Sequence, residues 1–435
     1  MSAGDGKAPL TVGIAGLGTV GSGTLRALAA NAEALALRCG RPIRVVAVSA
    51  RDRGKDRGLD LSGCRWLDDP LALAADPEVE VVVELIGGSD GPAKALVEAA
   101  LQAGKPVVTA NKALLAHHGT ALAQLAEAKG VGLCYEAAVA GGIPVIGLLR
   151  DGLAGNRVQR VAGILNGTCN YILTTMRESG REFADVLAEA QALGYAEADP
   201  SFDIDGVDAA HKLAILTALA FGCAVDFEAV RVEGIRDIAA LDIGFAEELG
   251  LRIKLLGVAT AEAEGVAQRV EPVMVPLGNP LAAVEGVFNA VLAKGDFVGT
   301  IMAEGAGAGE RPTASAVVAD LAAIARGYRR PVFGVPAAAL TRARPVPAEG
   351  QIGAYYLRLM VIDRPGVIAE VAAALRDEEI SVEALLQRGR APGEIVPVVI
   401  TTHETTEGRM RRAVARIDAL EACLESPRLI RIEGE

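Results

Sequence analysis

The sequence predicts an α/β protein built from three parts, and three features of the chain indicate it. First, a short apolar strand at residues 10–15 runs directly into a glycine-rich turn and a helical segment, which is how a nucleotide-binding parallel sheet begins. Second, strands and helices alternate as far as residue 135, as in a doubly wound sheet. Third, residues 354–435 follow the order strand, helix, strand, strand, helix, strand (βαββαβ), which is typical of a ferredoxin-like unit.

Length and composition limit the classes of protein that fit. At 435 residues the chain is long enough for about two to four domains. Hydrophobic residues make up 51% and charged residues 23%, which is the balance of a globular protein. The net charge of −12 and the aromatic content of 3% do not suit the binding of nucleic acid or of an anionic membrane. No apolar run approaches the roughly 18–20 residues that cross a bilayer. We therefore expect neither nucleic acid nor a membrane as a partner.

We expect a cytoplasmic protein with reduced thiols. The N-terminal residues MSAGDGKAPL are polar and lack the apolar stretch of a signal peptide. The cysteines are scattered and show no CxxC spacing, which argues against zinc or a disulfide framework. They are Cys39, Cys64, Cys134, Cys169, Cys223 and Cys423.

The first part, residues 1–135, is predicted to be a Rossmann-type domain that binds a dinucleotide. The strand at 10–15 leads into a GxGxxG turn, and a helical pattern follows from about residue 20 to 37. Glycines allow the tight turn and let the backbone approach a pyrophosphate at the helix N-terminus. The motif alone is weak, but the preceding strand and following helix make it specific. The turn residues predicted to contact the cofactor are Gly16, Leu17, Gly18, Thr19, Val20 and Gly21.

The end of the second strand, 43–48, favours NADP over NAD. An enzyme that uses NAD usually places a carboxylate here to bind the ribose hydroxyls. Here the strand is followed by Ser49, Ala50 and Arg51, and a guanidinium is suited to a 2′-phosphate. The neighbouring Asp52 leaves NAD open, and a surface arginine without a role in binding is the alternative.

The rest of the first part completes the sheet and places a lysine at its binding edge. Open parallel sheets bind ligands at the carboxyl ends of their strands. Lys112 follows such an end directly and is therefore predicted to face the cleft, whereas His117 and His118 are expected to be surface residues. The predicted strands are 79–86, 106–109 and 131–135, and the helices are 93–103 and 113–129.

The second part, residues 136–345, is predicted to be an α/β domain around a mostly β sheet, with 310–345 packing back on the first part. Its glycine-rich loop at 136–144 could hold a monovalent cation, but the residues alone favour a tight connector. A second glycine-rich loop, 305–309, is either flexible or lets the backbone approach the cofactor. The predicted strands are 158–165, 252–259 and 268–275, and the helices are 145–153, 171–178, 183–193, 209–221 and 314–326.

An acidic segment at 193–212 concentrates the reactive side chains of this part. Pro200 and flanking glycines argue against a regular helix in its first half. A helical pattern follows from residue 207, so Asp208 and Lys212 lie on one helical face. Such an arrangement suits a substrate with an ammonium group and a reaction that moves a proton. The alternative is a solvated loop followed by an ordinary surface ion pair.

Six motifs, in this order and spacing, resemble the homoserine dehydrogenase family. The resemblance covers roughly residues 10–345 and implies NAD(P)-dependent interconversion of L-homoserine and L-aspartate 4-semialdehyde, a branch step towards threonine, methionine and isoleucine. The motifs are GLGTVG (16–21), TANK (109–112), EAAVAGGIP (136–144), GILNGTCNYIL (163–173), LGYAEADPSFDIDGVDAAHK (193–212) and GAGAGERPTASAVVADL (305–321).

The resemblance also implies roles for single residues. Lys212 would be the catalytic acid and base, with Lys112 as its companion at the nicotinamide. Because Lys212 must be neutral to accept a proton, we expect an alkaline optimum for homoserine oxidation. By resemblance the substrate would be held by Glu197, Asp208 and Asp203, the cofactor also by Gly194 and Gly309, and a sodium ion by Glu136, Val139, Gly141 and Ile143. The last implication reverses the interpretation of 136–144 as a connector.

The third part, residues 354–435, follows a proline-containing linker at 339–353. Its Asp-Arg-Pro-Gly turn after the first strand resembles an ACT domain, a regulatory module that binds amino acids and usually pairs with a second copy. The resemblance implies threonine as effector, bound near Asp363, Gly366 and Val367, and a homodimer or homotetramer. A plain dimerisation module is the alternative.

Two other functions fit parts of the sequence. The first is a different oxidoreductase of amino acids or semialdehydes, which homoserine turnover would distinguish. The second is a nucleotide-sensing regulator without activity, which would not need the lysines and carboxylates of the acidic segment. Because only nine residues precede the first strand, too few for an aspartate kinase, we expect a monofunctional enzyme.

Overall fold

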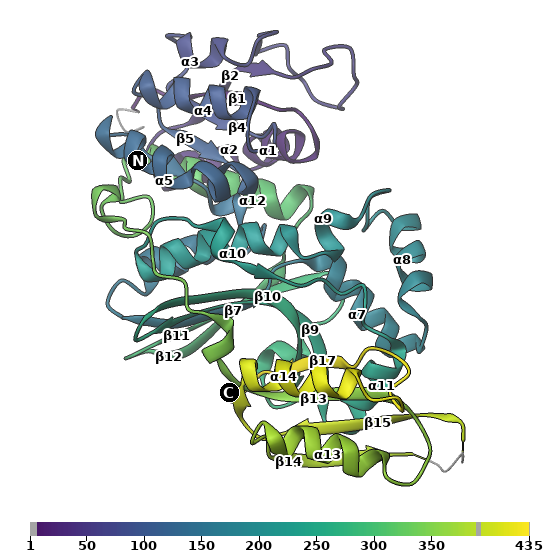
Figure 1. Ribbon diagram of the computed structural model, residues 1–435. Coiled ribbons are helices and arrows are strands. Elements are labelled where there is room, and N and C mark those ends of the chain that lie inside the picture. The colour runs from purple at the N-terminus through teal and green to yellow at the C-terminus, as the bar shows by residue number, and fades with distance from the viewer. Residues whose placement is uncertain (1–6, 389–392, 435) are drawn as a thin grey trace.

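The computed structural model describes residues 7–388 and 393–434, so the ends of the predicted first and third domains and residues 389–392 lie outside the described residues. Figure 1 shows three regions that follow one another along the molecule. The N-terminal sheet and its helices lie at one end, a second sheet with teal and green helices occupies the middle, and the yellow C-terminal elements lie at the other end.

The N-terminal region is a doubly wound parallel sheet, which confirms the predicted fold class. Its strand order is β3-β2-β1-β4-β5-β6, and neighbouring strands are parallel. The order reverses between β1 and β4, which is the topological switch point where such sheets bind nucleotides. The strands are β1 (Leu10–Ala15), β2 (Ile43–Ser49), β3 (Arg65–Trp66), β4 (Val81–Glu84), β5 (Val107–Thr109) and β6 (Leu133–Cys134); the helices are α1 (Thr19–Ala30), α2 (Ala32–Cys39), α3 (Ala72–Ala75), α4 (Pro92–Gln102) and α5 (Lys112–Ala128).

The helix predicted at 20–37 is two helices, because Asn31 interrupts it. Asn31 has φ −113° and ψ 17°, outside the helical region, and its Nδ2 donates a hydrogen bond to the carbonyl of Ala27 at 3.1 Å. An asparagine side chain that bonds to the backbone in this way competes with the continuing helix.

The middle region is built on a larger sheet whose order is β12-β11-β7-β9-β10 before it continues into the C-terminal region. Strands β11 and β12 were not predicted, because alanine and glycine give them weak strand propensity. Gly305 and Ala306 therefore belong to a strand and not to a loop. The strands are β7 (Val158–Ile164), β8 (Arg231–Val232), β9 (Leu251–Glu262), β10 (Gly265–Pro276), β11 (Phe288–Gly295) and β12 (Gly299–Ala306).

The helices of the middle region include two that were not predicted, α9 and α11. The first half of the acidic segment was predicted not to be a regular helix, and α9 is a single short turn there that follows Pro200, a position that proline tolerates. The helices are α6 (Val145–Gly147) with the π-helical Leu148–Gly152, α7 (Gly167–Ser179), α8 (Phe183–Ala192), α9 (Ser201–Ile204), α10 (Val207–Phe221), α11 (Ala240–Glu248) and α12 (Glu310–Ala325); the short 3₁₀ turns are Glu136–Ala138, Phe227–Ala229, Pro280–Ala283, Ala337–Ala339 and Ala348–Gly350.

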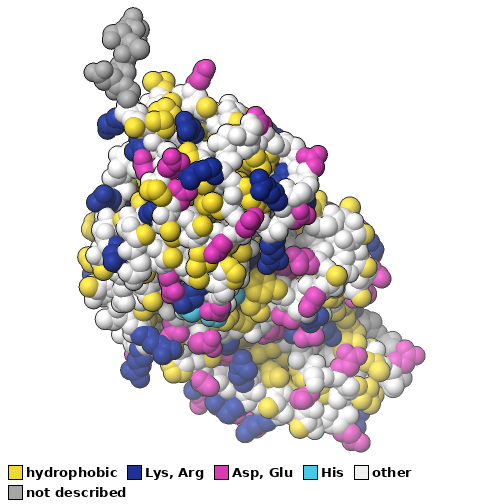
Figure 2. Space-filling model, turned by 90° about the horizontal axis from the view of Figure 1, so that it is seen from above, with side chains coloured by type: hydrophobic (Ala, Val, Ile, Leu, Met, Phe, Trp, Pro, Cys, Tyr) yellow, Lys and Arg dark blue, Asp and Glu magenta, His cyan; other side chains and the backbone are white. Residues whose placement is uncertain are grey.

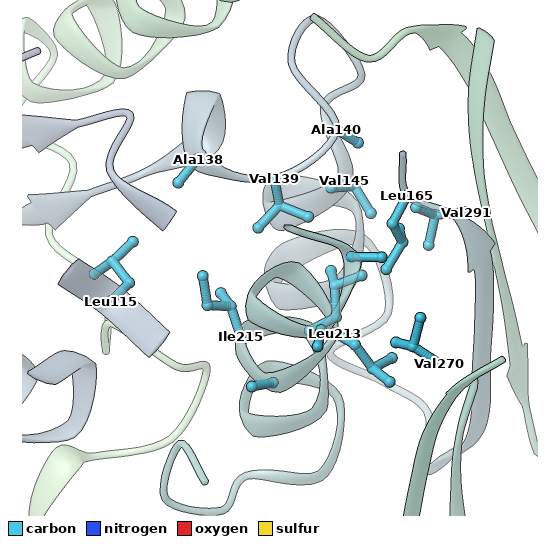
Figure 3. Close-up of a cluster of buried hydrophobic side chains, with 14 of the residues drawn as sticks. Leu115, Ala138, Val139, Ala140, Val145, Leu165, Leu213, Ile215, Val270 and Val291 are labelled. Atoms are coloured by element: carbon cyan, nitrogen blue, oxygen red, sulfur yellow. The ribbon is translucent and has the colours of Figure 1, made fainter. Parts of the chain in front are cut away.

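Helix α10 lies between the two sheets and is buried along most of its length. Figure 3 shows Ile215 pointing towards Leu115 of α5, while Leu213 points to the side of Leu165 and Val270. A glycine on the facing strand makes room there, since a Cβ added at Gly257 would lie 2.9 Å from Leu165 and 3.5 Å from Leu213. Packing on both faces fixes the helix that carries Asp208 and Lys212.

Helix α12 returns to the N-terminal region, although it follows the middle sheet in sequence. Figure 1 shows this green helix beside the purple and blue ones. Its apolar side chains, among them Val317 and Leu321, share a core cluster with Val12 and Ile14 of β1. The chain therefore crosses three times between the two regions, because the segment after α12 leads back to β10 of the middle sheet.

The C-terminal region has the predicted ferredoxin-like topology, with strand order β17-β13-β15-β14. Its edge strand β17 pairs in parallel with β10 of the middle region, through Val273 with Arg431 and Met274 with Ile432. One sheet of eleven strands thus runs through both regions. The elements are β13 (Ile352–Ile362), α13 (Val367–Asp377), β14 (Val382–Gln387), β15 (Ile395–Thr402), β16 (Thr405–Thr406), α14 (Glu407–Asp418) and β17 (Arg428–Ile432).

The predicted linker at 339–353 is partly structured. Val266 of β10 donates to the carbonyl of Arg344 at 2.9 Å and accepts from the amide of Val346 at 3.2 Å. Ile352 and Gly353, at the end of the predicted linker, already belong to β13. The linker is therefore tied to the middle sheet before the C-terminal region begins.

Acidic and basic side chains are interspersed on the face of the molecule shown in Figure 2. The six cysteines are free thiols. Within residues 7–388 and 393–434, no helix has the length and apolar character that crossing a membrane requires.

Candidate active site

A cleft of about 870 Å³ opens at the carboxyl ends of β1, β2 and β4, where the glycine-rich turn lies. The turn leaves no room for side chains at two of its glycines. Gly16 has φ +99°, and a Cβ there would lie 2.3 Å from the carbonyl oxygen of Leu85, while a Cβ at Gly21 would lie 2.0 Å from that of Gly16. At Gly18 nothing lies within 4 Å, so the backbone there is open to an approaching ligand. These features fit a dinucleotide pyrophosphate.

The structure brings some of the predicted cofactor residues to this cleft and places others elsewhere. Gly16, Leu17, Gly18 and Arg51 line it, and Thr19, Val20 and Gly21 form the first turn of α1 behind it. Three predicted residues are not among its lining residues, namely Lys112, Gly194 and Gly309. Gly194 is exposed after α8, and Gly309 is the N-cap of α12; both have positive φ, +77° and +113°.

The loop after β2 leaves both Arg51 and Asp52 exposed, and both line the cleft. One carboxylate oxygen of Asp52 accepts the amides of Gly54 at 2.8 Å and Lys55 at 3.1 Å. Arg57 ties the loop to the glycine-rich turn, because its Nε donates to the carbonyl of Leu17 at 3.1 Å. The preference for NADP over NAD stays a prediction.

Buried polar residues at the ends of β4 and β5 fix the start of α5. The fully buried carboxylate of Glu84 accepts the amides of Ile86 and Gly87, at 2.7 and 3.0 Å, and the hydroxyl of Thr109 at 2.6 Å. Asn111 caps α5 by accepting the amide of Leu114 at 3.0 Å. Sequence reasoning did not select these residues, although polar side chains at strand ends of a parallel sheet were the available signal.

Three charged side chains meet where α5 and α10 cross. Asp208 is 2% exposed, and its Oδ1 lies 2.6 Å from Nζ of Lys112 while its Oδ2 lies 2.7 Å from Nζ of Lys212. Lys212 is 8% exposed and also donates to the carbonyl of Leu165 at 2.7 Å. Since both members of the i,i+4 pair are buried, the alternative of a surface ion pair is wrong.

Asn166 joins the two acidic residues of this site, and sequence reasoning missed it as a site residue. Its Nδ2 donates to Oδ1 of Asp203 and to Oδ2 of Asp208, each at 2.8 Å. Its Oδ1 accepts the amide of Cys169 at 2.8 Å and so caps α7. The position of an asparagine directly before a helix was the signal in the sequence.

The surroundings of Asp208 and Lys212 on α10 lower the pKa of both side chains. Burial lowers the pKa of Lys212, the ammonium of Lys112 lowers it further, and Asp208 opposes both. Burial alone would raise the pKa of Asp208, but the two ammonium groups outweigh it and hold that pKa below its ordinary range. Burial raises the pKa of Asp203 and outweighs the hydrogen bond from Asn166.

An aromatic cluster of His117, Phe202, His211 and Phe227 borders the three charges. His211 is 5% exposed, and its ring centroid lies 4.5 Å from that of Phe227 and 5.2 Å from that of His117. The ring of Phe202 lies 5.5 Å from Nζ of Lys112, a cation–π distance. His117 is exposed as predicted but takes part in this cluster, and His118 contacts Asp90 at 3.0 Å.

Glu197, predicted to bind substrate, lies on the loop between α8 and α9 with an exposed side chain. Its carbonyl accepts a hydrogen bond from the side chain of Gln191 at 3.0 Å. The structure brings Asp203, Asp208, Lys112 and Lys212 together but leaves Glu197 outside this contact network. A role of Glu197 in binding stays a prediction.

The loop predicted to hold sodium has an unusual backbone. Ala140 and Gly141 both have positive φ, +56° and +53°, which is costly for alanine. The carboxylate of Glu136 accepts the amides of Ile146 and Gly147, at 2.7 and 2.9 Å, and so caps α6. Val139 and Ile143 are buried. Cation binding by these residues stays a prediction.

The three residues predicted to bind an effector lie at the start of α13. Gly366 is its N-cap with φ +99°, and Val367 is 3% exposed in the core of the C-terminal region. Asp363 donates its amide to the carbonyl of Glu394 at 2.8 Å. The side chain of Val367 therefore serves packing, and effector binding at this turn stays a prediction.

The chain matches two models of one family and a third model along its length. A homoserine dehydrogenase NAD-binding domain matches residues 16–136, a homoserine dehydrogenase model matches 144–322, and an ACT domain matches 355–422. The homoserine dehydrogenase of Neisseria gonorrhoeae is 48% identical over 433 residues, which is 98% of this chain and 99% of that protein.

Solved structures agree with these matches. The crystal structure of a homoserine dehydrogenase from Thiobacillus denitrificans is 48% identical with a TM-score of 0.92, and the match covers 98% of each chain. A hyperthermophilic archaeal homoserine dehydrogenase in complex with NADPH is 28% identical with a TM-score of 0.61, and the match covers 72% of this chain and 97% of that one.

Proposed function

Since this chain belongs to the homoserine dehydrogenase family, whose members are oxidoreductases, we propose that it interconverts L-homoserine and L-aspartate 4-semialdehyde with a nicotinamide cofactor. The reaction would serve the synthesis of threonine, methionine and isoleucine in the cytoplasm. The observation that carries the proposal is the buried carboxylate of Asp208 between two lysines, one of which, Lys112, begins α5 just after the carboxyl end of β5. A sensor without activity would have no use for this arrangement.

Lys212 is the group that moves the proton. In its neutral form the amine has two hydrogens, and the structure offers an acceptor to each, namely Oδ2 of Asp208 and the carbonyl of Leu165. The lone pair is then left for the hydroxyl proton of homoserine. Burial, which lowers the pKa of Lys212, favours this neutral form.

The remaining atoms of the reaction balance around this transfer. As the hydroxyl proton passes to Lys212, a hydride leaves the carbon that bears the hydroxyl group. The single bond between this carbon and the oxygen becomes the double bond of the aldehyde. The bound nicotinamide supplies the acceptor for that hydride. In the reverse direction the ammonium of Lys212 returns the proton to the aldehyde oxygen. Lys112, held by Asp208, places a positive charge where negative charge develops on that oxygen.

The amino group of homoserine is bound by the acidic segment. Asp208 and Asp203, which Asn166 bridges, would hold it together with Glu197 from the exposed loop before α9. A substrate ammonium among carboxylates is favourable, because most of its hydration is replaced by charged acceptors.

NADP is the preferred cofactor. This proposal is supported by the exposed Arg51 at the cleft and by the hydrogen bonds that hold Asp52 within its own loop. Gly194 and Gly309 would contact the cofactor from the middle region. A sodium ion at Glu136, Val139, Gly141 and Ile143 is supported by the strained backbone of that loop.

Threonine would regulate the enzyme through the C-terminal domain, at the turn that contains Asp363 and Gly366. Pairing of this domain with a second copy would give a homodimer or homotetramer. The match to an ACT domain supports both the regulation and the pairing, because such modules bind amino acids and usually pair with a second copy.

The first experiment measures homoserine-dependent reduction of NADP and of NAD by the purified protein, with and without threonine. We expect turnover that is faster with NADP and that falls as threonine is added. Absence of turnover with either cofactor would contradict the proposed reaction. Turnover that threonine does not change would indicate that the C-terminal domain serves assembly and not regulation.

The pH dependence of homoserine oxidation tests the role of Lys212. Because this residue must lose a proton first, the rate should rise with pH through a pKa below that of an ordinary lysine. Lys212→Ala should abolish turnover and leave NADPH binding, measured by fluorescence titration, intact. A profile that is flat between about pH 6 and 10 would contradict Lys212 as the base.

A further inference from the structure

We propose that Asn166 is a positioning residue of this site, whose amide holds Asp203 and Asp208 together and withholds part of the negative charge of Asp208 from Lys212. The inference rests on the proposed function and extends it to a residue that neither the sequence motifs nor the family match assigns a role. It follows from the hydrogen bonds of one buried side chain.

Every polar atom of the Asn166 side chain has a partner. Each hydrogen of Nδ2 points to a different carboxylate, Oδ1 of Asp203 and Oδ2 of Asp208, both at 2.8 Å. Oδ1 accepts the amide of Cys169 at 2.8 Å. A flipped amide would turn its oxygen towards two carboxylate oxygens, so only this orientation is compatible with the surroundings. At 4% exposure, water cannot readily replace these bonds.

Asp208 shares one oxygen between Asn166 and Lys212. Its Oδ2 accepts from Nδ2 of Asn166 at 2.8 Å and from Nζ of Lys212 at 2.7 Å. A hydrogen bond to a carboxylate oxygen draws on its negative charge, so the amide weakens the attraction that keeps Lys212 protonated. Without the amide, the charged form of Lys212 would be favoured more strongly and its pKa would rise.

The same loss would act on Asp203. Burial raises the pKa of this carboxyl, and the hydrogen bond from Asn166 opposes that rise. Removing the amide therefore moves the pKa of Asp203 upward as well. Since both groups act in their deprotonated forms, the rise of homoserine oxidation with pH is expected to move to higher pH.

Other charged and titratable groups also face Lys212, and a substitution at Asn166 leaves them in place. They come from α10 itself, from α5, from α7 and from the segment around α9. They are Asp208, His211, Lys112, Cys169 and Asp203.

Two substitutions distinguish the bridging role of the Asn166 side-chain NH2 group from the role of its oxygen as the cap of α7. Asn166→Ser keeps an oxygen that can cap α7, since serine is as good a cap as asparagine, but its shorter side chain cannot bridge two carboxylates. Asn166→Asp keeps the size and the cap but replaces the donor with a third carboxylate. The matched control is Asn279→Ser, because Asn279 caps the 3₁₀ turn at Pro280–Ala283 by accepting the amide of Leu281 at 3.0 Å, away from the site.

The experiment records kcat and kcat/KM for homoserine oxidation with NADP between about pH 6 and 10, together with the Tm of each protein. We expect Asn166→Ser to lower kcat at pH 7.5 by about 3- to 10-fold and to move the rise of the rate with pH up by about 0.5–1 pH unit, as the loss of one hydrogen bond to a charged group predicts. Asn166→Asp should move it further in the same direction, and Asn279→Ser should leave both quantities unchanged.

Three results would overturn the proposal. The first is an unchanged pH profile in folded Asn166 variants, and the second is a shift to lower pH. The third is failure of both variants to fold while Asn279→Ser folds, which would make Asn166 a purely structural residue. Wild-type protein without homoserine turnover would instead contradict the proposed function itself.

Discussion

At the scale of single residues, burial distinguishes two ion pairs of identical spacing. Lys212 and Asp208 are i and i−4 on α10, with side chains 10% and 3% exposed. Lys94 and Glu98 have the same spacing on α4, but their side chains are 30% and 43% exposed. An exposed pair contributes little to stability, whereas a buried pair changes the pKa of its members and leaves a costly charge when one is removed. The spacing in sequence is the same, so the difference comes from the surroundings.

His211 should make stability depend on pH. Burial, together with the neighbouring His117, lowers its pKa from 6.5 to about 4. Between these values the unfolded chain binds a proton at this position that the folded chain does not, so stability is complete above about pH 6.5 and falls as the pH drops towards 4. His211→Phe should keep the ring packing and flatten this part of the curve, measured by urea unfolding at pH 5 and 7.5.

The control for this variant is His403→Gln, since His403 is exposed in the C-terminal region. It should leave the pH dependence of unfolding unchanged. If His211→Phe loses as much stability between pH 7.5 and 5 as the wild type, protonation of His211 does not contribute.

At the scale of elements, the packing of α12 on α1 joins the two ends of the dehydrogenase part. A Cβ added at Gly23 of α1 would lie 2.6 Å from Cγ and 2.9 Å from the carbonyl oxygen of Glu310, and 3.3 Å from Cβ of Ala314. Glu310 also forms an ion pair with Arg26. Close approach of the two helices thus depends on the absence of a side chain at this position.

Gly23→Ala should therefore destabilise the protein, by about 1–3 kcal/mol, because the added methyl group forces the helices apart. Gly244→Ala on α11 is the matched control. That glycine is also inside a helix, but nothing lies within 4 Å of its added Cβ. The control should gain about 0.5–1 kcal/mol from helix propensity. Thermal unfolding measures both, and a stabilising effect at Gly23 would contradict the close contact.

At the scale of the whole molecule, the C-terminal domain is joined to the middle region by strand pairing and buried charges. Only two residue pairs connect β17 with β10. Around them lie four arginines and three glutamates from both regions, linked in one network of ion pairs. They are Arg160, Arg231, Arg269, Arg431, Glu271, Glu407 and Glu433. A regulatory signal from this domain would not have to cross a flexible linker.

A second buried contact between the same regions can be tested singly. Asp242 of α11 is fully buried and accepts from the guanidinium of Arg358 at 2.6 Å and from the hydroxyl of Tyr356 at 3.0 Å. Asp242→Asn would leave Arg358 without its counter-charge, so we expect a loss of about 2–4 kcal/mol of stability. Hydrogen exchange should become faster in β13.

Asp377→Asn controls for the removal of a carboxylate. Asp377 lies in the same domain and pairs with Arg376 and Arg416 at the surface. This variant should unfold at the same temperature as the wild type. Equal effects of the two substitutions would show that the contact at Asp242 does not hold the regions together.

The sequence alone determined the features that depend on neighbours along the chain. The strand, glycine-rich turn and helix at residues 10–30 are encoded locally, because glycines, apolar strand residues and helical periodicity act over a few positions. The same holds for the spacing of Asp208 and Lys212 and for the βαββαβ order of the C-terminal region. The family resemblance rested on such local motifs, and the comparisons confirm it.

Only the tertiary structure decided what meets across the chain. Asn166 and Asp203 are 37 positions apart, and Lys112 and Asp208 are 96, yet each pair is in contact. The joining of β10 with β17 and the return of α12 to α1 are likewise invisible in local patterns. Propensity and periodicity report which face of an element is apolar, but not which distant element covers it. That choice is made by burial and packing of the whole molecule.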